Sequence, residues 1–340
     1  MKEKIKEYLK SKGIKLDDRL LKYIENGFEI TEKDEYMHDW GTFPEYHNES
    51  WYFNFIDRQN NIFLITRISF VMDQNKSQIM FLLIIDGKIN TYFREPPLEK
   101  MPKNWEFDKN IKFFCVKPMN EWRVLYEDRK VKLDINFKGR FPVHNSAEGE
   151  DPIKSIEEFG IEILDVAAQQ HYEQPMIATG TLILKKKDET RSINALGHRD
   201  HSWGTRNWVK IDGWNWVSAQ FKDKTINFFR SKVLGKVPQY GTIFSKSGKT
   251  LIKKVEVSTE TKDDGKTPKS STFTLTDENG KVITVVSKTI FSLHFPVPST
   301  KGDNGGFSEV FEQVATFNVD NDKEIGSGIG ISEYMLSTHL

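Results

Sequence analysis

The sequence predicts an all-β protein made of antiparallel sheets, with a short helical segment before the first strand. Turn sequences typical of β-hairpins recur at short intervals, and no helical pattern lies between them. The 24 Phe, 10 Tyr and 8 Trp favour large apolar surfaces inside a β protein. Barrels or sandwiches are therefore expected rather than a parallel sheet. The turn sequences are Asp57-Arg58-Gln59-Asn60-Asn61, Asp86-Gly87, Glu127-Asp128-Arg129, Lys187-Asp188-Glu189, Asp212-Gly213, Lys222-Asp223, Ser247-Gly248, Asp264-Gly265, Asn279-Gly280 and Asp320-Asn321.

Residues 1–34 predict a helical N-terminal extension. Ile5 and Leu9 recur at helical spacing, and Gly13 is suited to end that helix. Residues 17–27 predict a second helix, with an aspartate at its start and Asn-Gly at its end. We expect both helices to pack against the outside of a barrel.

The β region divides into two predicted domains, for which a chain of 340 residues is long enough. Trp51 and Phe53 belong to the alternating aromatic pattern that opens the first strand. The polar stretch 145–151 near the middle of the chain is the best linker candidate. The sequence therefore predicts one domain over residues 35–150 and another over residues 151–340.

Composition excludes several classes of partner. Lys plus Arg and Asp plus Glu both number 49, so no basic surface argues for nucleic acid or for an anionic membrane. The single cysteine, Cys115, lies in an apolar run and fits a core thiol in a reducing compartment. No apolar run approaches the ~20 residues of a membrane span, and the N-terminus does not resemble a secretory signal. A cytoplasmic location is expected.

The most informative stretch is Gly197–Trp208, which reads GHRDHSWGTRNW. In an extended strand, successive side chains point to opposite faces. The two faces would carry His198, Asp200 and Ser202 on one side and Arg199, His201 and Trp203 on the other. One face could line a cavity while the other braces it. The alternative is a buried ion-pair network at a strand end, without catalysis.

This segment resembles the signature of the carotenoid 1,2-hydratase (hydroxyneurosporene synthase) and AttH-like superfamily. Three weaker matches accompany it, namely residues 47–53 (HNESWYF), residues 171–174 (HYEQ) followed by Gly180, and residues 328–334 (GIGISEY). The resemblance implies two lipocalin-like (calycin) barrels in tandem. It is poorly specific for the reaction, since members include hydratases, cyclases and proteins of no assigned activity.

Asp200 is the candidate catalytic residue if the resemblance extends to chemistry. Adding a proton to an alkene requires a neutral, poorly solvated carboxylic acid, and burial in an apolar pocket keeps a carboxyl group protonated. His198, expected on the same face, could hydrogen-bond Asp200 and return its proton. The hypothesis is acid-catalysed hydration or cyclisation of an isoprenoid or terpenoid C=C bond without a cofactor.

The developing carbocation would need aromatic faces, and a long hydrophobic ligand would need an apolar wall. The candidate substrate-binding residues are Trp203, Trp214, Trp216, Tyr172, His171 and His201. The residues assigned to structural support are Arg199, Glu173, Arg206 and Glu49. Arg199 is expected to pair with Glu173 or Glu49, away from Asp200. The remaining His38, His47, His144 and His339 lie in turn-like or terminal contexts and are interpreted as surface or structural.

Two other functions remain open. A tandem calycin could carry a small hydrophobic molecule without chemistry, and contact with a membrane surface could give such a ligand access. A non-haem iron oxygenase could use His198, Asp200 and His294. Against the oxygenase, no arginine follows His294 to hold a cosubstrate, and the resemblance carries no metal. No metal ligands are assigned, and the oligomeric state is left open.

Overall fold

Nearly the whole chain is β structure. The computed structural model describes residues 2–16, 21, 29–38, 45–98, 108–163, 166, 169–207, 210–298, 306–322 and 325–339. The strands are β1 (His47–Asp57), β2 (Ile62–Val71), β3 (Lys76–Ile85), β4 (Lys88–Arg94), β5 (Ile111–Lys117), β6 (Glu121–Glu127), β7 (Val131–Gly139), β8 (His144–Asn145), β9 (Gln169–Leu184), β10 (Glu189–Thr205), β11 (Ile211–Gln220), β12 (Lys224–Val233), β13 (Gln239–Ser245), β14 (Gly248–Thr261), β15 (Pro268–Asp277), β16 (Val282–Pro298), β17 (Gly306–Val319) and β18 (Ser327–His339). The helical elements are α1 (Lys2–Ser11), α3 (Pro152–Phe159) and the short 3₁₀ turns η1 (Glu32–Glu35), η2 (Met72–Gln74) and η3 (Ile161–Ile163).

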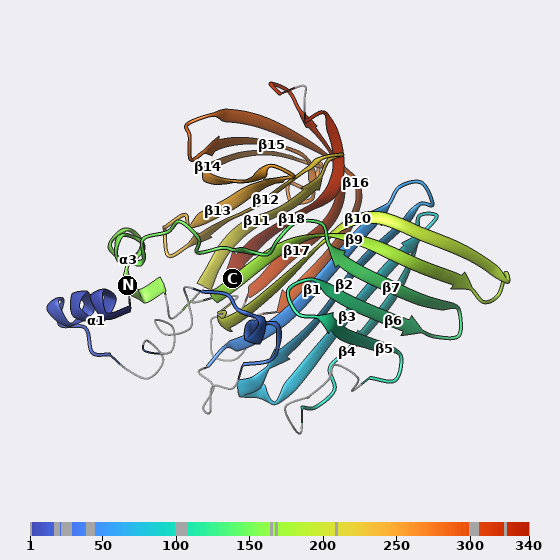
Figure 1. Cartoon of the computed structure of the whole chain (residues 1–340), viewed down its shortest axis with the longest axis horizontal. Coiled ribbons are helices and arrows are strands. Elements are labelled where there is room, and N and C mark those ends of the chain that lie inside the picture. The colour runs from blue at the N-terminus through green and yellow to red at the C-terminus, as the bar shows by residue number, and fades with distance from the viewer. Residues whose placement is uncertain are drawn as a thin grey trace.

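The strands form two antiparallel units, shown in Figure 1. The first, here called the half-barrel, is an open sheet in the order β4-β3-β2-β1-β10-β9-β7-β6-β5, with β8 paired to β9. The second, called the barrel, is closed by β11 to β18 in sequence order. The all-β class with two consecutive lipocalin-like units is therefore confirmed. The first unit is open, since the described residues of β4 and β5 form its two ends.

The chain passes from one sheet to the other between Thr205 and Ile211, not at residues 150–151 where the sequence placed the domain boundary. β9 pairs with β7, and β10 pairs with β1, so these two long strands complete the half-barrel. The GHRDHSWG segment accordingly belongs to the first sheet. The polar stretch 145–151 resembles a linker in composition because it contains turns and the N-cap of α3. At that cap, the Ile153 amide donates to Asp151 Oδ1 at 3.0 Å.

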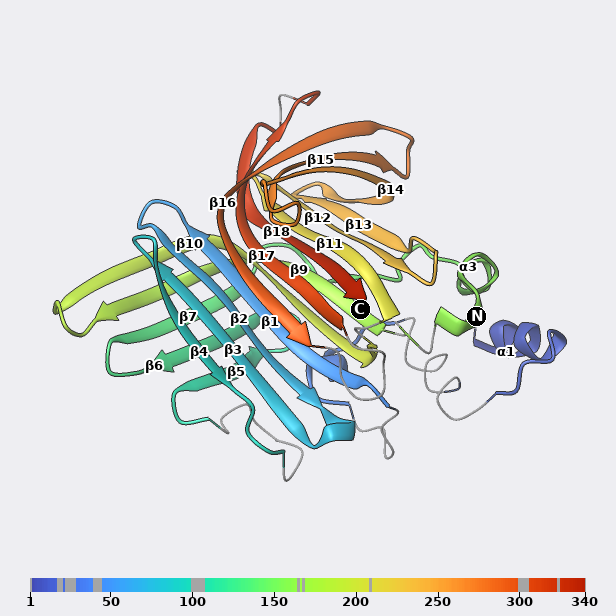
Figure 2. The ribbon, with the colours of Figure 1, turned by 180° about the vertical axis from the view of Figure 1, so that it is seen from behind.

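Three large apolar clusters form the core. One lies within the half-barrel, one lies within the barrel, and the third joins the two units. In Figures 1 and 2 the barrel lies against one face of the half-barrel, where the third cluster forms. Fully burying each large apolar side chain contributes ~1.5–3 kcal/mol. Examples are Trp51, Phe53 and Trp122 in the half-barrel, Val217, Phe228 and Phe317 in the barrel, and Tyr52, Ile65, Trp214 and Trp216 between them.

The N-terminal helix α1 packs on α3 rather than on a barrel wall. Its Ile5 and Leu9 are buried against residues of the α3 region, including Ile153 and Ile156. The Tyr8 hydroxyl donates to Glu157 Oε1 at 3.0 Å. The second helix predicted over residues 17–27 lies almost entirely outside the described residues.

Gly197 permits the close approach of β1 and β10 at the start of the GHRDHSWG segment. A Cβ atom at this position would lie 2.1 Å from the Asn54 carbonyl oxygen on β1. Gly180 does the same on β9, where its φ is +158° and a Cβ would lie 2.0 Å from the Asp134 carbonyl oxygen. Both glycines therefore support the pairing that positions β9 and β10.

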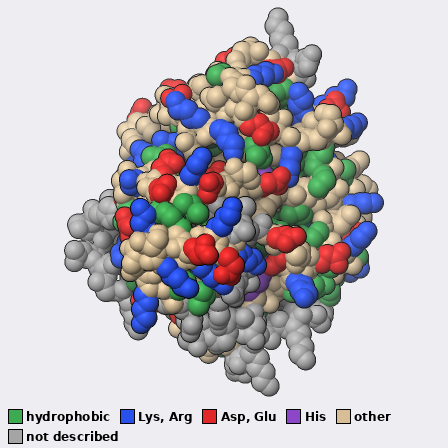
Figure 3. All heavy atoms as spheres, turned by 60° about the vertical axis from the view of Figure 1, so that its left-hand side comes forward, with side chains coloured by type: hydrophobic (Ala, Val, Ile, Leu, Met, Phe, Trp, Pro, Cys, Tyr) green, Lys and Arg blue, Asp and Glu red, His purple; other side chains and the backbone are tan. Residues whose placement is uncertain are grey.

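The surface carries charges of both signs. On the face shown in Figure 3, Lys and Arg side chains alternate with Asp and Glu side chains. Among the described residues, the helices are too short or too polar to cross a bilayer.

Candidate functional site between the half-barrel and the barrel

Asp200 lies at the centre of a cluster of polar side chains between the two sheets. Strand register places it directly opposite Tyr52 on β1 and Glu173 on β9. Tyr52 in turn lies opposite Arg67 on β2. We call this cluster, with the residues of β11, β13, β17 and β18 that face it, the inter-sheet site. Its members are Tyr52, Arg67, His171, Glu173, His198 and Asp200 from the half-barrel and Trp214, Trp216, Tyr240, Glu312 and Glu333 from the barrel.

Burial raises the pKa of Asp200 from its usual value near 4 to about 7. The charges of His171, Arg206 and Arg67 act in the opposite direction, whereas the Glu173 charge adds to the increase. The His171 Nε2 atom is 3.9 Å from Asp200 Oδ1, and the Asp200 side chain is 15 % exposed. Asp200 therefore holds a proton on a large fraction of molecules at neutral pH, and its carboxyl group is not fully enclosed.

Glu173 binds the two histidines that flank Asp200. Its Oε1 lies 3.0 Å from His171 Nε2, and its Oε2 lies 2.7 Å from His198 Nε2. Trp216 Nε1 also donates to Oε1, at 2.7 Å. Although burial alone would raise the pKa of Glu173, the charges and hydrogen bonds of the two histidines lower it to about 2. Glu173 is thus an ionised acceptor.

Two predicted partnerships in the site are therefore wrong. The hydrogen-bond partner of His198 is Glu173 rather than Asp200, and the histidine nearest the Asp200 carboxyl group is His171. Arg199 pairs neither with Glu173 nor with Glu49. Side chains two residues apart on a strand point the same way, but a residue on the neighbouring strand is closer to each of them.

The barrel forms the second wall of the site. Trp214 and Trp216 project from the same face of β11, as the sequence predicted, and both are buried in the inter-sheet cluster. Trp214 Nε1 donates to Glu333 on β18. Trp216 lies edge-on to Tyr52, with ring centroids 5.4 Å apart. The Tyr240 hydroxyl lies 3.1 Å from His171 Nδ1, so side chains of the barrel contact the half-barrel residues that surround Asp200.

The opposite face of β10 belongs to the half-barrel interior. Arg199 is fully buried and makes a two-pronged ion pair with Glu35, including a 3.1 Å bond from Nη2 to Oε2. Trp122 Nε1 and the Tyr172 hydroxyl each donate to Glu35 Oε1 at 2.8 Å. Tyr172 is therefore committed to this ion pair.

Trp203 and His201 also lie on this inner face, away from Asp200. Trp203 stacks on His38 with ring centroids 4.3 Å apart, and His201 Nε2 is 3.0 Å from Glu49 Oε1. Strand alternation accounts for this placement, because residues 199, 201 and 203 alternate with residues 198, 200 and 202. Tyr172, His201 and Trp203, which the sequence predicts to bind substrate, therefore lie on the face away from Asp200.

The supporting residues occupy different places. Glu49 binds His38 and His201 inside the half-barrel, whereas Arg206 donates from Nη2 to Ser202 Oγ at 3.0 Å near the inter-sheet site. Trp208, the last residue of the central stretch, lies outside the described residues.

Two groups of side chains have donor atoms close enough together to hold a metal ion. In the described part of the chain they are His38, Glu49 and His201, and His171, Glu173 and Asp200. The triad of an iron oxygenase proposed from His198, Asp200 and His294 is not assembled. His294 stacks on Phe311 with ring centroids 4.6 Å apart, and its Nε2 lies 3.5 Å from Glu309.

His38 should make the stability of the protein depend on pH above neutrality. Burial opposes its protonation, but hydrogen bonds to Asp34 and Glu49 raise its pKa from 6.5 to about 9. Its stabilising contribution is therefore complete below pH 6.5 and is lost between pH 6.5 and about 9. We expect the free energy of unfolding to fall by roughly 2–3 kcal/mol over that range.

His38→Gln should remove most of this slope in urea unfolding at pH 6, 7.5 and 9. Glu260→Gln, which changes an exposed pair with Lys269, supplies the control and should retain the wild-type slope. An unchanged slope in His38→Gln would show that another group controls the pH dependence.

Sequence reasoning missed several residues of the two clusters. Glu35, Arg67 and Glu312 carried no motif signal, since their partners come from distant strands, whereas Tyr52 lies within the HNESWYF match. Glu333 lies within the GIGISEY match, which was the available signal. Three of the histidines interpreted as surface or structural are not at the surface, as His47 and His144 are buried and His38 is half-buried, while the His339 side chain lies outside the described residues.

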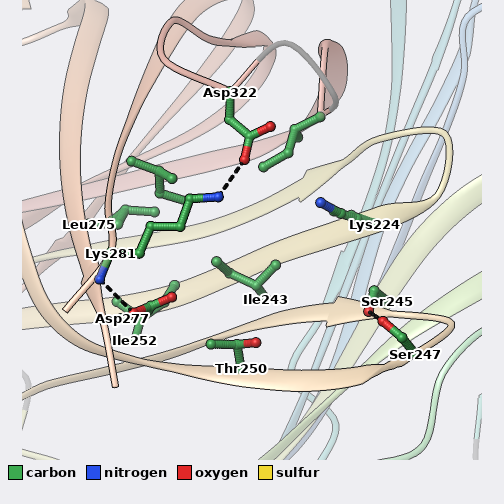
Figure 4. A pocket seen from close by; sticks show the side chains of 12 residues that line it. Lys224, Ile243, Ser245, Ser247, Thr250, Ile252, Leu275, Asp277, Lys281 and Asp322 are labelled. Carbon is green, nitrogen blue, oxygen red and sulfur yellow. Dashed lines mark hydrogen bonds and ion pairs between the residues drawn. The ribbon is translucent and has the colours of Figure 1, made fainter. Parts of the chain in front are cut away.

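A separate cavity of about 240 Å³ lies at one end of the barrel (Figure 4). Its wall includes Lys281, whose Nζ is 2.7 Å from Asp322 Oδ2, and Lys224 and Asp277. No residue of the inter-sheet site lines it. The cavity therefore offers no access to Asp200.

Comparison with known sequences places the chain in one family. The sequence profile described as Domain of unknown function (DUF7064) matches residues 31–337. A search of curated protein sequences gave no significant match.

Solved structures share the fold at low sequence identity. An AttH-like protein from Nitrosomonas europaea aligns with a TM-score of 0.61 and 14 % identity, covering 91 % of this chain and 96 % of that chain. Kievitone hydratase from Nectria haematococca gives 0.59 and 12 %, covering 91 % and 93 %. CghA with Sch210972 gives 0.59 and 10 %, covering 87 % and 89 %. These similarities show that the chain has the tandem fold of these proteins.

Proposed function

The chain belongs to the DUF7064 family, and we propose that it is an enzyme that hydrates or cyclises a carbon–carbon double bond of a hydrophobic substrate at the inter-sheet site. The observation that carries the proposal is the buried Asp200 carboxyl group, whose pKa is raised to about 7 beside aromatic side chains of the barrel. A kievitone hydratase among the structural neighbours supports this reaction class. An isoprenoid or terpenoid substrate and a cytoplasmic location are further parts of the proposal.

In the proposed reaction, protonated Asp200 transfers its proton to one carbon of the double bond. A C–H bond forms, the π bond breaks, and the adjacent carbon becomes cationic. The ring faces of Trp216 and Tyr52, which contact each other across the site, would stabilise that cation by ~1–2 kcal/mol each when desolvated. Water then adds to the cation and the resulting oxonium ion loses a proton, or a second double bond of the same substrate adds and the new cation loses a proton from a neighbouring carbon. In both cases the proton released returns to the Asp200 carboxylate, so no cofactor is consumed.

The histidines have a positioning role in this scheme. Glu173 holds His171 beside Asp200 and fixes His198 on the strand row next to it. His171, whose pKa is raised by the Glu173 and Asp200 charges despite its burial, would stabilise the Asp200 carboxylate after proton transfer. The Asp200 carboxyl group therefore loses and regains its proton while His171 and His198 stay in place.

Isotope incorporation tests the reaction class directly. The purified protein is incubated with panels of carotenoid, squalene and polyprenyl alkenes in H₂¹⁸O and, separately, in D₂O, and the products are analysed by mass spectrometry. Hydration should add one ¹⁸O and one deuterium per product, whereas cyclisation should add deuterium without ¹⁸O when the cation is quenched by proton loss. A product with neither isotope would contradict acid catalysis.

A non-catalytic carrier is the second candidate. The apolar side chains around the site, including Val314, Ile331 and Met335, would hold a lipid-like molecule equally well without chemistry. Lipids that copurify with the native protein and are recovered unchanged after incubation would favour the carrier. Conversion of the same lipids would favour the enzyme.

A further inference from the structure

Glu312 on β17 presents an unsatisfied carboxyl oxygen to the inter-sheet site. The residue is 4 % exposed, and its Oε2 makes no hydrogen bond with any described residue. A buried polar atom without a partner costs ~1–3 kcal/mol, so native structures retain few of them. Such an atom is available to a hydrogen-bonding group of a ligand or to a buried water.

The protonation of Glu312 defines what this atom can bind. Burial raises the pKa of Glu312 well above its usual value, and the charge and hydrogen bond of Glu333 raise it further, followed by the Asp200 charge. These effects favour the neutral form of the Glu312 carboxyl group. Trp214 Nε1 donates to Glu333 and holds that carboxylate in place. A neutral carboxyl group bound at one oxygen can exchange a hydrogen bond with a hydroxyl or carbonyl group at the other.

Tyr52 offers a second unsatisfied group from the opposite wall. The residue is 5 % exposed, and its hydroxyl makes no hydrogen bond of normal geometry within the described residues, although the Asn54 side chain is close enough to lower its pKa. Burial, together with the charges of Glu312 and Glu333, raises the pKa of Tyr52 well above 10, so the hydroxyl stays neutral. Register places Tyr52 directly opposite Asp200.

We propose that Tyr52 and Glu312 form an oxygen-binding subsite beside Asp200, and that the ligand is a hydrophobic molecule carrying a hydroxyl or carbonyl group. This inference rests on the proposed function only in placing the ligand at the inter-sheet site. A bare hydrocarbon would leave both buried groups without partners, whereas an oxygenated ligand satisfies them. Sites built to hydrogen-bond an oxygen discriminate against analogues that lack it for this reason.

Farnesol and farnesene, which share a carbon skeleton and differ in a hydroxyl group, provide a matched pair of probes. Their affinities are measured on the full-length protein by equilibrium dialysis with tritiated ligands. The wild-type protein should bind farnesol about tenfold more tightly than farnesene, as one to two hydrogen bonds provide. Tyr52→Phe and Glu312→Met should each weaken farnesol binding by about fivefold and leave farnesene binding unchanged or tighter.

Tyr126→Phe is the control, since the Tyr126 hydroxyl binds Asp128 at 3.2 Å elsewhere in the half-barrel. It should change neither affinity. Tyr52→Phe removes a single oxygen atom, and its melting temperature verifies that the fold is retained. Equal wild-type affinities, no binding of either probe, or equal losses for both probes in the two variants would overturn the subsite. Selective farnesol binding with no isotope incorporation would contradict the proposed function but would still support the subsite.

Discussion

Replacing Asp200 by Asn should lower turnover by about 100-fold or more, the usual size of an acid–base contribution. The amide keeps the shape of the protonated carboxyl group but has no proton to transfer. In the wild-type protein, turnover should be greatest at low pH and fall as the pH rises through about 7, because ionisation removes the acid. The measurement is product formation against pH, using the substrate identified by isotope incorporation.

The stability of the same variant distinguishes catalysis from a structural role. A carboxyl group whose folded pKa lies above its unfolded value costs stability as the pH rises from about 4 to about 7, and the full cost is present above pH 7. Asp200→Asn should therefore keep or raise the melting temperature at pH 8. Asp134→Asn, in the partly exposed pair with Arg123, is the matched control and should retain full turnover. Full activity with a lowered melting temperature in Asp200→Asn would make Asp200 a structural residue.

Replacing Glu35 by Gln should destabilise the protein by about 3–5 kcal/mol, the cost of leaving one partner of a buried ion pair uncompensated. Arg199 is fully buried and depends on Glu35 for its counter-charge. Trp122 and Tyr172 also donate to the Glu35 carboxylate. Urea unfolding at pH 7 provides the measurement.

Two further variants test this explanation. Glu260→Gln, in an exposed pair, should leave the unfolding free energy unchanged. Combining Glu35→Leu with Arg199→Met should recover part of the loss, because no unpaired charge remains.

Burial opposes the ionisation of Glu35, but Arg199 lowers its pKa below the usual 4.5. The wild-type stability from this pair is therefore present above pH 4.5 and is lost as the pH falls through the folded pKa. A loss below about 1 kcal/mol in Glu35→Gln would show that the pair contributes little.

The sequence was sufficient for the fold class because that information is local. Hairpin turns and aromatic alternation depend on neighbouring residues, and they correctly predicted antiparallel strands and the shared face of Trp214 and Trp216. The boundary between the sheets was not predictable in this way. The pairing of β9 with β7 and of β10 with β1 joins segments far apart in the chain, and a polar turn looks the same within a domain as between domains.

In the candidate site, too, the sequence predicts what depends on neighbouring residues and does not predict contacts between distant segments. Alternation along β10 correctly places Arg199, His201 and Trp203 on the face opposite Asp200, so the choice of His201 and Trp203 as substrate-binding residues did not follow from that alternation. The partners of these side chains come from distant segments of the chain: His198 binds Glu173 on β9, and Arg199 binds Glu35 in η1. Tertiary contacts of this kind have no signature in a single sequence.

The alternation of β10 also has a consequence for insertions and deletions. A slip of one residue against β1 would place the Arg199 guanidinium group in the inter-sheet site and bring the Asp200 carboxylate against Glu35. Both faces of the strand would then hold the wrong charge, so a register shift here would destabilise the inter-sheet site and the half-barrel interior together. The β9–β10 hairpin projects from the sheet in Figure 1. Lys185 is bound to the neighbouring β6–β7 turn, since its amide donates to the Lys130 carbonyl oxygen at 2.9 Å and its Nζ to Glu127 Oε1 at 2.8 Å. Length variation in this hairpin should therefore be confined to residues 186–188, which makes them a suitable position for an inserted epitope or label.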